Sequence, residues 1–104
     1  MLHNRNNRII YIDMDNVIVD FKSGLDKVSE EIKSQYKDDG TGKPHYDDIP
    51  GIFSLMEPMK DAVESIKAIA ETKHYQLYIL STAPWGNPSA WCDKLKWVKH
   101  YFDS

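Results

Sequence analysis

The chain has 104 residues but only one cysteine, Cys92, so an internal disulfide is excluded. Its longest apolar runs span a few residues, far short of the roughly 20 that cross a bilayer. The opening MLHNRNNR lacks the apolar stretch of a signal peptide. These absences favour a cytoplasmic protein with no membrane segment, and a free thiol fits a reducing compartment.

Basic residues are also few and scattered. Thirteen Lys and Arg against sixteen Asp and Glu give a net charge of -3. Proteins that bind long nucleic acids usually concentrate basic residues on one face, so we expect no polymeric nucleic-acid partner. A small anionic substrate would need local compensation, from a metal ion or a few cationic groups. The composition, 41% hydrophobic and 28% charged, is typical of one small globular domain, which we assign to residues 1–104.

Two short apolar runs predict β-strands. Residues 9–12 (IIYI) lie between Arg8 and Asp13, and residues 75–80 read YQLYIL. Runs without polar alternation are typical of strands buried on both faces, as in parallel sheets. The sequence therefore predicts a parallel sheet that contains these two strands.

Apolar residues at helical spacing predict three helices, over about 21–37, 59–72 and 87–102. The breaker-rich residues 37–44 form a loop. The order is strand, helix, insert, helix, strand, helix, which indicates a right-handed parallel α/β unit. The inward face of the last helix is marked by Trp91, Leu95, Val98 and Phe102.

Candidate chemistry lies at the carboxyl ends of the two strands, where α/β proteins bind ligands. Asp13 and Asp15 follow the first strand, and Ser81 and Thr82 follow the second. Two carboxylates in one crevice repel each other unless a cation is present, and their oxygens suit Mg²⁺. We therefore expect Asp13 and Asp15 to be metal ligands.

This constellation suits phosphoryl transfer. One aspartate can attack phosphorus to form an aspartyl-phosphate, and the other can act as general acid and base. The hydroxyls of Ser81 and Thr82 can hold phosphate oxygens, although Thr82 is also a common turn residue. Lys94 and Lys96 lie on an amphipathic helix, where we expect them to be solvated.

Four segments resemble the 5'(3')-deoxyribonucleotidases of the haloacid-dehalogenase superfamily, in that family's order. Residues 13–21 (DMDNVIVDF) resemble the family's opening DMDGVLADF. Residues 53–59 (FSLMEPM) are similar to its aromatic stretch followed by LEP, and residues 78–84 (YILSTAP) to its second motif. Residues 94–102 (KLKWVKHYF) resemble its helix EKYxWVxxYF.

The resemblance implies an α/β fold of the haloacid-dehalogenase type, a Rossmann-like parallel sheet with a small helical cap over about residues 22–57. It implies a magnesium-dependent phosphomonoesterase acting on (deoxy)nucleoside monophosphates. Asp13 would be the nucleophile, Asp15 the acid and base, and Thr82 a phosphate ligand.

Aromatic residues are the candidates for contact with the substrate. By the resemblance, Phe21 and Phe53 would flank the nucleotide base, whereas their pattern alone favours the core. Trp85, in a Pro-Trp-Gly-Asn-Pro loop, is harder to explain as core and is a candidate cap or substrate contact.

The sequence departs from the family at two places. Asn16 replaces a glycine in the turn, a mild change because Asn tolerates left-handed backbone. The family's later strands, which carry a lysine and further metal-binding aspartates, have no counterpart after Phe102. We therefore expect an incomplete sheet, from a shortened product, a chain that needs a partner for the missing strands, or one that self-associates through an open sheet edge.

These departures leave two alternatives to a nucleotide phosphomonoesterase. One is a phosphatase for another small phosphomonoester. The other is a catalytically inactive fragment that serves as a binding or assembly module.

Overall fold

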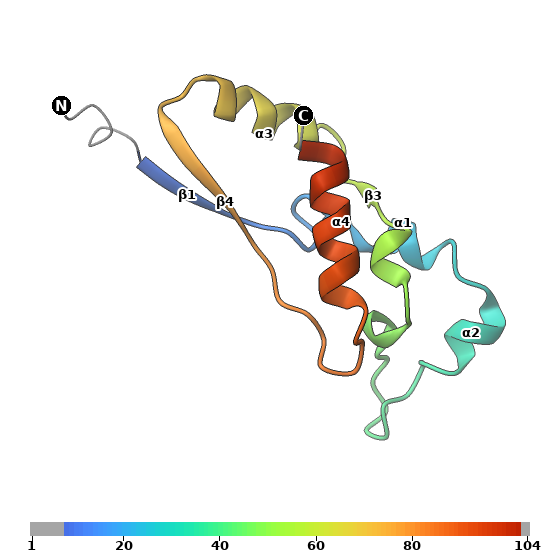
Figure 1. Cartoon of the computed structure of the whole chain (residues 1–104). Helices are drawn as coiled ribbons and strands as arrows, with labels where there is room; N and C mark the ends of the chain where they lie inside the picture. The colour runs from blue at the N-terminus through green and yellow to red at the C-terminus, as the bar shows by residue number, and fades with distance from the viewer. Residues whose placement is uncertain (1–7, 103–104) are drawn as a thin grey trace.

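The structure, a computed structural model, describes residues 8–102 and has α/β architecture. Figure 1 shows β1 and β4 side by side as a twisted ribbon, with α3 next to the strands, α4 between the ribbon and the segment of α1, and α2 farthest from the sheet. In chain order the elements are β1 (Arg8–Asp13), β2 (Val19–Asp20), α1 (Phe21–Leu25), α2 (Glu30–Ser34), the 3-10 helices η2 (Tyr46–Asp48) and η3 (Ile52–Ser54), β3 (Glu57–Pro58), α3 (Ala62–Glu71), β4 (Tyr75–Leu80) and α4 (Ala90–Phe102). No helix in the described range is long and apolar enough to cross a membrane.

The predicted parallel pairing is confirmed. β1 and β4 run in the same direction, with Arg8 opposite Tyr75 and Asp13 opposite Leu80. Within residues 8–102 this sheet contains only these two strands, and a separate short antiparallel pair joins β2 to β3. The carboxyl ends of β1 and β4 therefore meet at one edge, which is where the candidate residues follow them.

The expectation that both strands are buried on both faces is wrong. One face is partly buried against the helices, and its Ile12 and Ile79 line the same small hollow as Ile66 of α3 and Phe102 of α4. The opposite face is exposed, because the helices that pack on the sheet cover only one side. The exposed large side chains of that face are Ile9, Tyr11, Tyr78 and Leu80.

The predicted helix over 21–37 is instead two short helices. α1 ends at Leu25, and Ser29 then adopts an extended backbone with its hydroxyl accepting from the N–H of Ile32 at 3.3 Å. A serine in this position is a favourable helix N-cap, so a new helix starts where the spacing of apolar residues indicated continuity. The other two predicted helices are confirmed as α3 and α4, with later starts at Ala62 and Ala90.

The face of α4 that packs inward agrees with the prediction in part, because Val98 and Phe102 pack against the core. Ala90, Lys94 and Trp97 are buried, whereas Trp91 and Leu95 are exposed. Trp97 packs against the insert, which comprises about residues 22–57, and donates from Nε1 to the carbonyl of Met56 at 2.8 Å. The insert therefore covers the side of α4 that carries the lysine, and the core lies between the insert, α4 and the turn after β1. The buried apolar core residues are Met14, Ile18, Val19, Ile49, Ile52, Phe53, Met56, Ala90 and Trp97.

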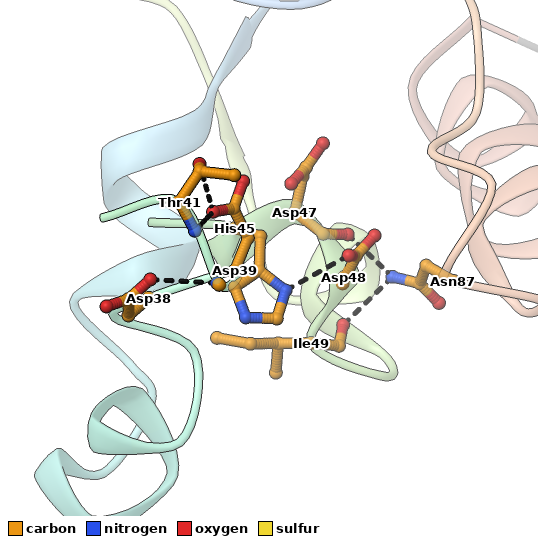
Figure 2. A network of polar contacts seen from close by, with 9 residues as sticks. Asp38, Asp39, Thr41, His45, Asp47, Asp48, Ile49 and Asn87 are labelled. Atoms are coloured by element: carbon orange, nitrogen blue, oxygen red, sulfur yellow. Dashed lines mark hydrogen bonds and ion pairs between the residues drawn. The ribbon is translucent and has the colours of Figure 1, made fainter. Parts of the chain in front are cut away.

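Asn87, in the loop between β4 and α4, forms hydrogen bonds to the insert. Its side chain is only 2% exposed, and its Nδ2 donates to the carbonyls of Asp47 and Ile49, both at 2.9 Å. Figure 2 shows this amide beside the two carbonyls, with His45 Nδ1 close to Asp48 at 3.2 Å in the same segment. The conformation of residues 47–49 thus depends on a residue about 40 positions later.

Replacing Asn87 by alanine is expected to lower the free energy of unfolding by about 1–3 kcal/mol, because two carbonyls would lose their donor in a buried place. Urea unfolding followed by circular dichroism measures this change. Gln35→Ala, at an exposed position, is the matched control and should change stability by less than about 0.5 kcal/mol. Equal unfolding midpoints for the two variants would show that Asn87 does not hold the insert.

Candidate active site

The acidic turn after β1 is tightly closed by backbone hydrogen bonds. The N–H of Met14 donates to the carbonyl of Leu80 at 3.0 Å, which continues the sheet past Asp13. The chain then reverses, and Val19 N–H donates back to the carbonyl of Met14 at 3.0 Å. Asn16 has a φ of 58°, in the left-handed region that asparagine tolerates better than most residues. This turn fixes both aspartates at the mouth of the sheet.

Four of the predicted site residues come together. Asp13 and Asp15 line one hollow, of about 530 Å³, together with Leu80, Ser81 and Thr82. The register of the sheet explains this, because Asp13 lies directly opposite Leu80 and the two strands end together. The carboxylates and hydroxyls therefore face a shared space that is open to solvent.

Lys94 completes this group, and the expectation that it is solvated is wrong. Its side chain is 3% exposed, and its Nζ lies 3.0 Å from Asp15 Oδ2 and 2.8 Å from Ser81 Oγ. It also donates to the carbonyl of Thr82 and lies 4.4 Å from the centre of the Phe53 ring. A buried ammonium group needs such partners, and here they connect both strand ends.

One signal in the sequence could have identified Lys94. It lies three residues before Trp97 and four after Ala90, which is the spacing of one helical face. Trp97 is the largest side chain of that face, and the structure buries all three residues. A lysine on the same face as a buried tryptophan is a candidate for a paired, functional cation.

A second hollow, of about 250 Å³, adjoins the acidic turn. Phe21 and Phe53 contact each other edge to face, with their ring centres 6.2 Å apart. Both are part of the core packing and both line this hollow, so the two interpretations of these rings are compatible. Asp47 of the insert also reaches it, which the sequence did not indicate. The lining residues are Asp15, Phe21, Asp47, Phe53, Thr82, Ala83, Pro84 and Lys94.

Trp85 lies elsewhere. Its side chain is fully exposed, and it does not line either hollow beside the acidic turn. The structure therefore brings together the predicted aspartates, hydroxyl residues and phenylalanines, but leaves Trp85 outside this group.

The donors at the turn fit a magnesium ion in part. Carboxylate and carbonyl oxygens are the ligands that Mg²⁺ prefers, and it commonly takes one or two carboxylates and fills its other positions with water and phosphate oxygens. Asp13 and the backbone carbonyl of Asp15 can provide such oxygens, while Asp15 Oδ2 is engaged by Lys94. Within residues 8–102 no group of three or more His, Cys, Asp or Glu residues could hold a metal.

An acidic turn, hydroxyl groups and a buried lysine thus lie at the ends of two parallel strands, the edge at which α/β proteins bind their ligands. No protein-family model matches the chain. It is 50% identical, over 93 residues that cover 89% of it, to the "Putative 5'(3')-deoxyribonucleotidase" of Vibrio phage KVP40. It is 30% identical, over an alignment of 110 residues in length that covers 88% of this chain, to the "Putative 5'(3')-deoxyribonucleotidase R824" of Acanthamoeba polyphaga mimivirus.

The resemblance that the motifs predicted is thus confirmed, and over most of its length the chain is a homologue of proteins that carry this name. The chain spans about half the length of both relatives.

Proposed function

We propose that this chain carries the nucleophile-bearing part of a phosphomonoesterase site of the haloacid-dehalogenase type, which removes phosphate from (deoxy)nucleoside monophosphates. One observation supports this most strongly: two aspartates, two hydroxyl residues and a buried lysine converge where β1 and β4 end. The names of the two homologues agree with a nucleotide phosphatase function.

Asp13 and Asp15 have different surroundings, which suit different roles. Among the described residues no cation lies within ion-pair distance of Asp13, whereas Asp15 is paired with Lys94. An unpaired carboxylate is the better nucleophile, so Asp13 attacks phosphorus and the bond from phosphorus to the ester oxygen breaks. Mg²⁺, held by Asp13 and the Asp15 carbonyl, would screen the phosphate charge.

Asp15 then handles the protons. Once the phosphate has displaced it from Lys94, Asp15 takes up a proton from solvent, donates it to the departing alkoxide and later accepts one from the water that hydrolyses the aspartyl-phosphate, so free phosphate leaves and Asp13 is regenerated. An entering phosphate dianion competes with Asp15 for the Lys94 ammonium, which releases Asp15 for this exchange. Ser81 and Thr82 orient the phosphate oxygens without adding negative charge.

The hollow lined by Phe21 and Phe53 is the place for the nucleoside. Phe21 is the better residue to test, because Phe53 is buried in the core. Phe21→Ala is expected to weaken nucleotide binding by about 1–3 kcal/mol, the contribution of one base stacked on an aromatic ring. Calorimetry with a deoxynucleoside monophosphate measures this, and inorganic phosphate is the internal control. Equal losses for both ligands would mean that Phe21 only supports the fold.

Catalysis is best tested in a full-length hybrid, in which this chain replaces the matched half of the Vibrio phage protein. We expect Mg²⁺-dependent phosphate release from deoxynucleoside monophosphates that a chelator abolishes. Release that does not depend on metal would contradict the proposal. Equal turnover of simple esters such as p-nitrophenyl phosphate would instead favour a general phosphatase.

A further inference from the structure

The insert carries one carboxylate, that of Asp47, whose contacts differ from those of its neighbour. Among residues 8–102, the side chain of Asp47 takes part in no ion pair and no hydrogen bond. The carboxylate of Asp48 is engaged, because His45 Nδ1 lies 3.2 Å from its Oδ2. Figure 2 shows the Asp47 carboxylate turned away from this pair. Asp47 is therefore available to bind a ligand.

The fold fixes the backbone of Asp47, although its side chain is exposed. The carbonyl of Asp47 accepts from Asn87 Nδ2 at 2.9 Å, and Asn87 is buried. Asp48 lies against Gly86, where an added Cβ atom would come within 2.8 Å of its Oδ2. The 3-10 helix η2 is thus packed against the loop that follows β4. A ligand-binding group held on fixed backbone can select among similar ligands better than one on a mobile loop.

Asp47 lines the hollow of about 250 Å³ in which the proposed function places the nucleoside. Three other lining residues, Asp15, Thr82 and Lys94, belong to the group at the acidic turn, where the phosphate is expected. The remaining lining residues are apolar: Phe21, Phe53, Ala83 and Pro84. Outside the group at the turn, Asp47 is therefore the only described lining residue with a polar side chain, and it can give this part of the hollow its specificity.

A carboxylate accepts hydrogen bonds through both of its oxygens and donates none. Among the DNA bases, only guanine carries two adjacent N–H donors on its Watson–Crick edge, N1–H and the N2 amino group. Thymine offers one N–H between two carbonyl oxygens, which an ionised carboxylate repels, and adenine and cytosine place an unprotonated nitrogen beside their amino group. Two parallel hydrogen bonds to a charged group are stronger and more specific than one. The chemistry of Asp47 thus matches guanine best.

We propose that Asp47 selects guanine, so that dGMP is the preferred substrate of this site; the inference rests on the proposed function, which places the nucleoside in this hollow. The phosphate then lies beside Lys94, because the ammonium group attracts it and the Asp47 carboxylate repels it. The base lies against the Phe21 ring with its Watson–Crick edge toward Asp47. A contact between Asp47 and a sugar hydroxyl is the alternative, and it would favour no base.

Calorimetry of the chain in the presence of Mg²⁺ tests this preference, with dGMP, dIMP and dTMP as ligands. We expect dGMP to bind at least about tenfold more tightly than dTMP, which is within the range for one bidentate contact between a side chain and a base. The affinity for dIMP should be intermediate, because its base keeps N1–H but lacks the N2 amino group. Equal affinities for the three nucleotides would overturn the proposal.

Two variants make the test specific to this carboxylate. In Asp47→Asn the side chain keeps one acceptor and gains a donor, so the affinity for dGMP is expected to fall at least about tenfold, whereas that for dTMP should stay within about threefold. Asp26→Asn is the matched control, because Asp26 is an exposed carboxylate outside this hollow, and it should leave both affinities unchanged. Equal losses for dGMP and dTMP in Asp47→Asn would indicate a contact with the sugar or a role in the fold, and would overturn the proposal.

Failure of this inference can be distinguished from failure of the proposed function, because binding requires no catalysis. Phosphate release by the full-length hybrid without any preference for dGMP would remove the role of Asp47 and keep the phosphatase. A preference for dGMP in binding that depends on Asp47, in a hybrid that releases no phosphate, would do the reverse. No binding of any of the three nucleotides would overturn the inference, and turnover by the hybrid would still decide the function.

Discussion

Replacing Asp13 by asparagine is expected to lower phosphate release by the full-length hybrid at least about a thousandfold, because the amide cannot attack phosphorus. The change keeps the size of the side chain, and Asp13 is exposed at the end of β1, so the fold should be retained. Initial rates of phosphate release, at saturating Mg²⁺ and nucleotide, measure the effect.

Asp26→Asn is the matched control for this experiment. Asp26 is a surface carboxylate that pairs with Lys22 at 2.9 Å and, through that hydrogen bond, raises the pKa of the lysine. Exposed pairs of this kind contribute little to stability, and the residue lies outside the hollows at the acidic turn. Its rate should match that of the unmodified hybrid. A rate for Asp13→Asn within tenfold of this control would rule out Asp13 as the nucleophile.

Lys94→Met is expected to have the second largest effect, lowering kcat/KM by about 100-fold or more. Methionine keeps most of the length of the side chain, so the substitution removes mainly the charged group that contacts Asp15, Ser81 and the Phe53 ring. The affinity for inorganic phosphate should fall as well, and calorimetry measures it.

Lys96→Met is the control for this variant, since it removes a lysine two residues away that is exposed on the same helix. We expect its kcat/KM to stay within about twofold of the unmodified hybrid, because exposed lysines on a helix are usually solvated. Equal losses of kcat/KM in the two lysine variants would contradict a role for the Lys94 ammonium group in the active site.

Much of the fold could be predicted from the sequence, because local patterns decide it. The runs at 9–12 and 75–80 are apolar and β-prone, and the two strands that they predict do pair in parallel. Ligands of α/β sheets lie at the carboxyl ends of the strands, so this pairing alone was enough to place Asp13 beside Ser81 and Thr82.

Other features depend on packing that no local pattern describes. The apolar runs predict burial on both faces, but what covers a strand lies elsewhere in the fold, and one face here is open. The break between α1 and α2 follows from a capping serine within an otherwise continuous apolar pattern. Lys94 resembles a solvated helix lysine in the sequence, because the groups that bury and pair it, Phe53 and Asp15, come from distant parts of the chain.

Several expectations stay predictions. The boundaries of the cap at about 22–57, the need for Mg²⁺, a cytoplasmic location and self-association through the sheet edge are all open to experiment. The Mg²⁺ requirement is the most informative of these, because the described residues offer only part of a ligand set.

Acid quenching of the hybrid during turnover, followed by mass spectrometry of its peptides, tests the phosphoryl-transfer chemistry most directly. A phosphoryl group is expected on the peptide that contains Asp13, bound as an acyl phosphate that hydroxylamine removes, and it should be absent from the Asp13→Asn variant. Phosphate release with no such adduct, or with the adduct on a different residue, would contradict the assignment of Asp13 as the nucleophile.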